Sequence, residues 1–289
     1  MTAFAIKFER SSVTIASDTL AYVPRRGEAR PLGFISKVIG LPQLRAVLFS
    51  RGQYEILVRV AAAAMLSPQT LGIEDLADAL PAMLRIETDA YAEAHDIDDW
   101  RGVNLCEVVL AGWSEAGERM RMWCLNNYED YTAQDDGGRF YGQLMTMPRL
   151  SDAQLRGIDK QPTIAALVAA MKVERQVFAD NPDLMGGMIL GGEILATEIT
   201  PAGVSQRVVH RFEDFEATRH AAAAVAGRIL RGDDVPAVAD GLRRLDECSG
   251  LDDLPNASAP STPPVITGTS RQQRRAAEKL ARKAGRRAA

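Results

Sequence analysis

The chain has 289 residues, of which 46% are hydrophobic, so it can bury a core as one large domain with appendages or as two smaller domains. Its 34 Lys and Arg residues are balanced by 38 Asp and Glu, which argues against a strong overall attraction to nucleic acid or to an anionic membrane. No basic segment precedes an apolar one near the start, and no apolar run reaches about 18 residues, so we expect a cytoplasmic protein without a membrane span.

The first third of the chain is typical of two β-hairpins followed by two helices. Short β-branched or aromatic runs flank a polar turn in the first hairpin and a Gly-Leu-Pro turn in the second. The second helix has an acidic start and apolar residues at helical spacing, and Pro81 in its interior could kink it. The expected strands are 4–8, 13–15, 35–39 and 44–49, the helices are 53–65 and 73–94, and 23–34 is interpreted as a loop.

The middle of the chain returns to strands. Two apolar runs joined by a polar turn predict a third hairpin, and an alanine-rich stretch predicts a helix before a last pair of strands. These strands are 107–113, 120–125, 193–199 and 203–210, and the helix is 163–178. Because helices and strands come in blocks rather than alternating singly, the pattern predicts an α+β fold.

After residue 212 the composition changes. Segments 217–230 and 235–247 are rich in Ala and Arg and read as helices, whereas 254–268 is rich in Pro, Ser and Thr, as linkers are. Ser270 could cap a final basic helix. We therefore predict a folded domain at 1–212, a helical extension at 213–247, a disordered linker at 248–269 and a basic tail at 270–289.

The tail has three interpretations. It is a solvated appendage, a contact for an acidic partner or another copy of the chain, or a nonspecific nucleic-acid-binding segment. It contains no aromatic residue, which argues against base stacking. The basic residues that would make the contact are Arg271, Arg274, Arg275, Lys279, Arg282 and Lys283.

Neither a metal nor an organic cofactor is expected. The cysteines form no close pair, the histidines lack metal-ligand spacing, and glycine-rich phosphate fingerprints are absent. Two of the cysteines lie in strand-like stretches, where a buried thiol is the default interpretation. The residues concerned are Cys106, Cys124 and Cys248, and His95, His210 and His220.

Thr2, Asp18 and Lys37 are the residue types that an N-terminal-nucleophile hydrolase needs. If Met1 is removed, the α-amine of Thr2 lies beside its own hydroxyl and can take the hydroxyl proton. A free α-amine titrates near ~7.7–8.0, and a nearby Lys⁺ would enlarge its unprotonated fraction. Each residue alone has an ordinary explanation: Met-Thr starts are common, Asp often precedes a turn, and an edge-strand lysine is usually solvated.

The segments Thr2-Ala-Phe-Ala-Ile-Lys-Phe, Val13 to Tyr22 and Ser36-Lys37-Val-Ile-Gly40 resemble the start of proteasome β-type subunits and the related bacterial proteasome-like protease. Thr2 then matches the family's nucleophile and Asp18 its aspartate without a gap. Lys37 matches the family's lysine if the loop before it is about three residues longer than usual. The resemblance covers roughly residues 2–212 and implies a four-layer αββα sandwich, a homo-oligomer, and threonine-type hydrolysis of peptide or other amide bonds.

The sequence also departs from the family. Phe49 stands where a glycine usually presents its N–H to the oxyanion, so Phe49, Ser50 and Gly52 are the oxyanion candidates. The family's Gly-Ser-Gly turn and its Asp followed by Ser-Gly-Gly are not evident, although Asp183 precedes two Gly-Gly pairs. The alternative is a noncatalytic protein of this fold that serves assembly or partner binding.

Overall fold

The computed structural model describes residues 3–25, 28–67, 72–102, 105–135, 140–147, 149–181 and 190–230, and these belong to one compact unit. Thr2 and the second helix expected in the extension, 235–247, lie outside the described residues. The predicted linker and basic tail lie outside them as well, so the expected boundaries after residue 230 stay predictions.

A five-stranded antiparallel sheet is built around the N-terminal hairpin, which the sequence predicted. The strand order is β10-β1-β2-β11-β12, so the central strand β2 pairs with the first strand of the chain and with one from near its end. The strands are β10 (Leu144–Met147), β1 (Phe4–Phe8), β2 (Val13–Asp18), β11 (Glu193–Thr200) and β12 (Gly203–Arg211).

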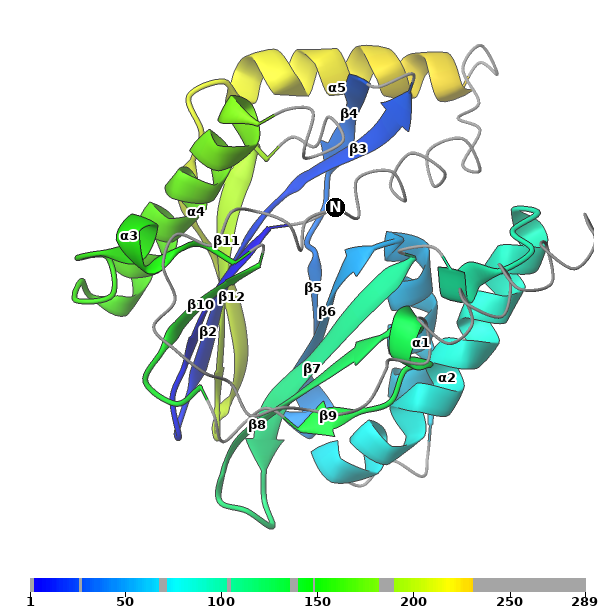
Figure 1. Cartoon of the computed structure of the whole chain (residues 1–289), viewed down its shortest axis with the longest axis vertical. Coiled ribbons are helices and arrows are strands. Elements are labelled where there is room, and N and C mark those ends of the chain that lie inside the picture. Colours follow the sequence, from blue (N-terminus) through cyan, green and yellow to red (C-terminus); the bar gives the residue numbers. More distant parts are fainter. Residues whose placement is uncertain are drawn as a thin grey trace, which may run out of the picture. The chain divides into compact units, whose positions relative to one another are not determined.

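A second antiparallel sheet, also of five strands within the described ranges, follows the chain order β5-β6-β7-β8-β9. Neighbours in sequence are neighbours in the sheet, as expected where turns are short. Figure 1 shows it facing the first sheet. Its strands are β5 (Val38–Leu41), β6 (Ala46–Gly52), β7 (Cys106–Ser114), β8 (Arg119–Asn126) and β9 (Gln134–Asp135).

The helices lie on the outer sides of these sheets. In Figure 1 α4 covers the first sheet, and α1 and α2 cover the second. The helices are α1 (Tyr54–Leu66), α2 (Ile73–Ala94), α3 (Asp152–Leu155), α4 (Thr163–Asp180) and α5 (Phe215–Leu230), with 3-10 turns at Pro42–Leu44, Trp100–Gly102 and Asn127–Glu129. Sheets and helices together confirm the α+β prediction.

The segment 23–34 is not the loop that the sequence suggested. It belongs to a two-stranded ribbon of β3 (Leu20–Arg25) and β4 (Glu28–Phe34), against which α5 packs with a ring contact between Phe34 and Phe215 at 4.9 Å. The sequence did not predict β4 because Pro31 and Gly33 lie within it, and both residue types argue against a strand. In a two-stranded ribbon each strand has a free edge, where proline is tolerated.

Alternating side chains bury both faces of the inner strands of each sheet. In β1, Phe4 and Ile6 point into a cluster shared with the second sheet, whereas Ala5, like Ala3 just before the strand, packs against α4. The same period of two divides β6, where Phe49 faces the first sheet and Leu48 faces α1. Strands buried on both faces explain why the sequence shows continuous apolar runs rather than polar alternation.

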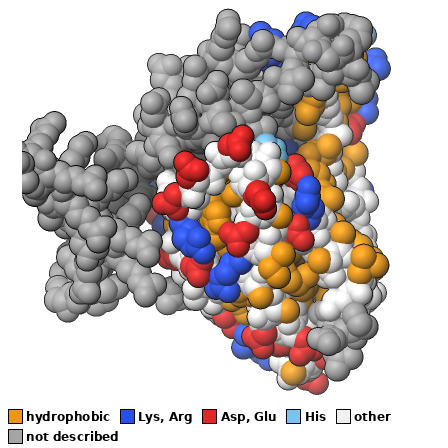
Figure 2. All heavy atoms as spheres, turned by 90° about the vertical axis from the view of Figure 1, so that its right-hand side faces the viewer, with side chains coloured by type: hydrophobic (Ala, Val, Ile, Leu, Met, Phe, Trp, Pro, Cys, Tyr) orange, Lys and Arg blue, Asp and Glu red, His pale blue; other side chains and the backbone are white. Residues whose placement is uncertain are grey.

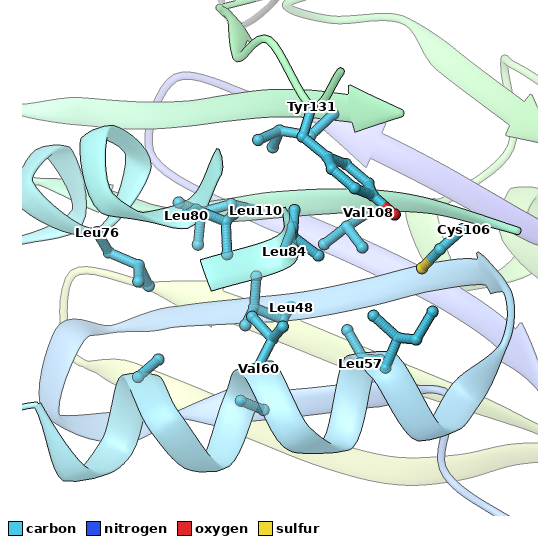
Figure 3. Close-up of a cluster of buried hydrophobic side chains, with 14 of the residues drawn as sticks. Leu48, Leu57, Val60, Leu76, Leu80, Leu84, Cys106, Val108, Leu110 and Tyr131 are labelled. Atoms are coloured by element: carbon cyan, nitrogen blue, oxygen red, sulfur yellow. The ribbon is translucent and has the colours of Figure 1, made fainter. Parts of the chain in front are cut away.

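The largest cluster lies between the second sheet and helices α1 and α2 (Figure 3). Its few polar groups are paired inside it. The Tyr131 and Thr88 hydroxyls are 2.8 Å apart. The Asn127 side chain accepts from the Leu105 and Cys106 amides and donates to the Trp100 carbonyl.

The face formed by α1 and α2 carries exposed apolar side chains among charged ones (Figure 2). On α1 these are Val58, Met65 and Leu66, and on α2 Ile86 is exposed. In the described parts of the chain, no helix has the length and apolar character needed to cross a membrane.

Candidate active site

The candidate site lies at one end of the first sheet, where β1 begins and β2 ends. Phe4 pairs with Ser17 on one side and with Met147 on the other, so the chain preceding Phe4 runs beside Asp18. Ala3 is buried in the cluster beneath α4. Residue 2 follows Ala3 directly, so its backbone continues from this end of the sheet.

Asp18 and Lys37 form a buried ion pair at this end. Lys37 Nζ is 2.6 Å from Asp18 Oδ1, and the two residues are 4% and 1% exposed. The other carboxylate oxygen, Oδ2, accepts a 3.4 Å hydrogen bond from the Gly191 amide. Because the Lys37–Asp18 distance is short and the pair is shielded from water, the contact is a charge-assisted hydrogen bond with a defined geometry.

Lys37 lies between β4 and β5, one residue before the strand in which the sequence placed it. The ordinary explanation of a solvated edge-strand lysine is wrong, because its side chain is buried. Burial lowers the pKa of Lys37, and the charge of Asp18 and its hydrogen bond act against that decrease. The ammonium is therefore poorly hydrated and relies on one carboxylate.

Further polar groups surround this pair. Burial and the charge of Asp18 raise the pKa of Tyr22 on β3, whereas Arg51 on β6 acts to lower it. Arg51 Nη1 is 3.3 Å from Glu107 Oε2, so a second ion pair lies near the first. Tyr22 and Arg51 were not among the expected site residues, although Tyr22 ends the segment Val13 to Tyr22 and Arg51 lies between Ser50 and Gly52.

Glu174 on α4 is the other buried acid of this region. It is 0% exposed, and within the described part of the chain neither carboxyl oxygen has a hydrogen-bond partner at good geometry, although the main chain of Met147 lies near enough to act as a weak donor. Burial, and then the negative charge of Asp18, raise its pKa well above the ordinary value, while Arg51 and the main chain of Met147 lower it. A carboxyl group in this setting favours the neutral form.

Glu174 could have been noticed from the helical pattern. The buried residues of α4 recur at helical spacing, and the acid falls on that apolar stripe rather than on the exposed side. The stripe is Ala166, Leu167, Ala170, Met171, Glu174 and Phe178.

The ring of Phe49 is buried, so it does not project into an open substrate cleft. Its side chain is 0% exposed and packs against Phe4, with ring centroids 4.8 Å apart. Its backbone is paired on both sides, with Val38 of β5 and Val109 of β7.

Ser50 and Gly52 are adjacent to Phe49 on β6. Ser50 is buried on the opposite face and lies beside the Cys106 thiol, where burial raises the pKa of Cys106 to about 12. Gly52 has a φ of 105°, and a Cβ there would lie 2.1 Å from the Leu105 carbonyl oxygen. Local backbone geometry alone therefore requires this glycine.

Two glycines just before β11 lie close to Asp18 and to the next residue, Thr19. Gly191 donates to Asp18, and Gly192 has a φ of 81° and no room for a side chain, since a Cβ would lie 2.5 Å from Thr19 Oγ1. Asp183 and Gly186-Gly187, like Thr2, lie outside the described residues.

In the described ranges, no three His, Cys, Asp or Glu side chains are grouped so as to hold a metal ion. Cys106 is a buried thiol and Cys124 is a partly buried one. His95 Nδ1 is 2.8 Å from the Tyr91 carbonyl oxygen, and His220 Nδ1 is equally far from that of Glu216.

Comparison with known proteins gives similarity at the level of structure. No family model and no curated protein sequence matches the chain. Anbu (ancestral beta-subunit) from Yersinia bercovieri is similar over 81% of this chain and 97% of its own, with a TM-score of 0.49 and 13% identity. A Gly-1 mutant of Anbu from Hyphomicrobium sp. strain MC1 has a TM-score of 0.43 and 16% identity over 80% of this chain and 97% of its own.

A further structure of Anbu from Hyphomicrobium sp. strain MC1 has a TM-score of 0.46 and 15% identity, covering 80% of this chain and 96% of its own. The interpretation of the site therefore rests on its own geometry.

Proposed function

We propose that this protein is a threonine-type N-terminal-nucleophile hydrolase that cleaves peptide or other amide bonds. The observation that carries the proposal is the buried Asp18–Lys37 pair at the sheet end from which residue 2 continues. A protein gains little stability from an ion pair withdrawn from water, because desolvation offsets most of the attraction. Such a pair at the end of the sheet where β1 begins is better explained by chemistry than by stability.

The proposed fold is the four-layer αββα sandwich. Three separate clusters of buried side chains support it: one beneath α4, one shared by the two sheets, and one beneath α1 and α2. By resemblance to proteasome subunits we also propose a homo-oligomer, and from the sequence pattern we propose that it works in the cytoplasm. Light scattering of the purified protein tests the oligomer directly.

In the proposed mechanism, the Thr2 hydroxyl oxygen attacks the substrate carbonyl while the α-amine of Thr2 takes the hydroxyl proton. That proton is then given to the leaving amine as the C–N bond breaks, which leaves an ester on Thr2. Water, deprotonated by the same α-amine, attacks the ester, and the amine returns that proton to the Thr2 oxygen as the C–O bond breaks and the acid leaves. Lys37 favours the neutral α-amine by like-charge repulsion, and Asp18 holds Lys37 in place.

The oxyanion of the tetrahedral intermediate needs main-chain or side-chain donors. Phe49, Ser50 and Gly52 remain the proposed candidates. Phe49 is the last residue of β6 that pairs with β5. The main-chain groups that follow Phe49 in β6 and face the β5 side therefore make no hydrogen bond to β5. This favours Ser50 over Phe49, whose own position lies within the paired region.

Intact mass and peptide hydrolysis together test the proposal. We expect the native chain to begin at Thr2 and to hydrolyse short fluorogenic peptide amides. Thr2→Ala should abolish the activity without changing the fold, and Thr132→Ala, at an exposed threonine, is the matched control. A native chain that retains Met1 would exclude the mechanism.

A native chain that begins at Thr2 but hydrolyses no peptide or other amide substrate would favour the alternative, a noncatalytic protein that serves assembly or partner binding. A salt-sensitive contact of the basic residues near the C-terminus with an acidic partner or nucleic acid would then be examined by deleting residues from 255 onward.

A further inference from the structure

A polar pocket lies on the outer face of the first sheet, beside the start of α4. Its volume is about 240 Å³, and its walls come from β1, the turn after β1, β2, β11, β12 and the first residues of α4. Helix α4 covers β1 and β2 on this face (Figure 1), and its first two residues, Thr163 and Ile164, border the pocket. Nothing in the mechanism above uses this pocket.

The register of the sheet sets a basic, a hydroxyl and an acidic side chain in a row across the floor of the pocket. Lys7 of β1 pairs with Thr14 of β2, and Thr14 pairs with Glu198 of β11. Thr14 lies on the same face as Ala16, which packs in the cluster beneath α4. The row therefore belongs to the helix-covered face of the sheet.

Thr14 is the observation that points to a ligand. It is 7% exposed, and in the part of the chain that the structure describes its hydroxyl has no hydrogen-bond partner. Buried hydroxyl groups are normally paired, because leaving one without a partner costs stability. A valine would fill the same space without that cost, so the hydroxyl is better explained by a partner that enters the pocket.

The positive groups of the pocket are Lys7, Arg207 and the start of α4. Lys7 Nζ donates to the Gly142 carbonyl oxygen at 2.8 Å, and neither cation is in an ion pair with a described residue. The N-cap of α4 is Pro162, which offers no side-chain cap, and the first turn holds no acidic residue. The first amides of the helix have no partner within the helix, so they favour a negatively charged group.

The negative groups are Glu9 and Glu198. Glu9 Oε2 accepts a 3.5 Å hydrogen bond from Ser12 Oγ, and within the described ranges neither carboxylate is in an ion pair. Two carboxylates beside two cations leave the side chains of the pocket without net charge, which disfavours a simple anion. Opposite charges that do not pair with each other suit a ligand that carries both.

We propose that this pocket binds a small zwitterion of the amino-acid class. The ligand carboxylate accepts hydrogen bonds from Lys7, Arg207, the Thr14 hydroxyl and the start of α4. The ligand ammonium donates to Glu9 and Glu198.

The pocket is separate from the candidate active site. Thr14 precedes Asp18 by four residues on β2, which is about 13 Å along a strand. The inference goes beyond the proposed function, because binding here requires neither removal of Met1 nor hydrolysis.

Isothermal titration calorimetry of the full-length native protein with glycine tests the inference. Glycine has no amide bond, so the proposed hydrolase activity does not consume it. Acetate and methylamine each carry one of its two charges and are titrated at the same ionic strength, since salt screens exposed charges. We expect saturable binding of glycine, about tenfold tighter than that of either single-charge compound.

Three variants assign the contacts. Glu198→Gln should weaken glycine binding about tenfold and leave acetate binding unchanged, whereas Arg207→Gln should weaken both. Both side chains are exposed, so these variants should fold as the native chain does. Thr14→Val should weaken glycine binding about fivefold without lowering the midpoint of urea unfolding, because the hydroxyl that it removes has no partner among the described residues.

Lys172→Gln and Asp180→Asn are the matched controls, since both change exposed charges on α4 outside the pocket. We expect them to bind glycine as the native protein does. The inference is overturned if glycine gives no saturable binding, if acetate binds as tightly as glycine, or if Glu198→Gln and Thr14→Val bind glycine like the controls. None of these results bears on the proposed hydrolase.

Discussion

The two buried polar regions of this protein differ in charge and in completeness. Beneath α1 and α2 the polar groups are neutral and paired with one another: the Thr88 and Tyr131 hydroxyls meet, and the Asn127 amide satisfies three main-chain groups. At the end of the first sheet the groups are ionisable, and among the described residues Glu174 has no well-formed hydrogen bond, only a weak contact with the main chain of Met147. Neutral, complete networks stabilise a fold, whereas charged, incomplete ones cost stability and indicate chemistry.

The largest effect should come from breaking the ion pair. Lys37→Met leaves Asp18 as a buried charge without its partner, so we expect the free energy of unfolding in urea to fall by about 3–5 kcal/mol. Lys172→Met, at an exposed lysine of α4, should change it by less than about 0.5 kcal/mol.

The double variant Asp18→Leu/Lys37→Met sharpens the comparison. Replacing a buried ion pair by apolar side chains is often neutral or stabilising, so the double variant should recover the stability lost in Lys37→Met. It should have no hydrolytic activity. A double variant as unstable as the single one would show that the pair is needed for the fold, and the contrast between the two regions would fail.

Asn127 tests the neutral region. Asn127→Ala leaves the Leu105 and Cys106 amides without their acceptor, and we expect a loss of about 2–4 kcal/mol in the free energy of unfolding. Activity per folded molecule should be unchanged, because the network lies on the helix side of the second sheet. Lost activity at full folding would connect this network to the site.

Glu174 predicts a pH dependence of stability in a chain that keeps Met1, such as the variant Thr2→Leu. Because the folded pKa of Glu174 is raised above the unfolded value near 4.5, the folded chain binds more protons in the window above that value. The stability that Glu174 contributes is full below the unfolded pKa and is lost as pH rises through the folded pKa.

Between the unfolded and the folded pKa of Glu174, the free energy of unfolding of Thr2→Leu should fall by about 1.4 kcal/mol per pH unit relative to that of Thr2→Leu/Glu174→Gln. Urea unfolding of both chains between pH 4 and pH 8 measures the difference. If the free energies of unfolding of the two chains change in parallel with pH, Glu174 is ionised in the folded chain without a partner or is solvated, and the raised pKa is contradicted.

The smallest effect is expected for Tyr131→Phe, which removes one hydroxyl from a buried pair. The Thr88 hydroxyl then lacks its partner, at a cost of about 1 kcal/mol. Activity should not change. A much larger loss would mean that the ring itself shifts within the cluster.

The sequence predicted much of this architecture, since the N-terminal hairpin, helices α1, α2 and α4 and the last strand pair lie close to the expected positions. Asp18 and Lys37 were proposed from their residue types, their spacing and the resemblance to proteasome β-type subunits. The ribbon β3–β4 was missed because Pro31 and Gly33 interrupt it and because its stability comes from packing with α5. Glu174 was missed because a glutamate on a helix is normally solvated, and only its place on the apolar stripe distinguishes it.

The most direct test of the central claim is reaction of the native protein with a peptide epoxyketone, a reagent whose two electrophilic carbons bond to a hydroxyl and an adjacent free amine. We predict a single covalent adduct that peptide mass spectrometry places on both the hydroxyl oxygen and the α-amine of Thr2, and that is lost in the folded double variant Asp18→Leu/Lys37→Met. A native chain that forms no adduct at residue 2, or an adduct that forms equally fast without Asp18 and Lys37, would contradict the account.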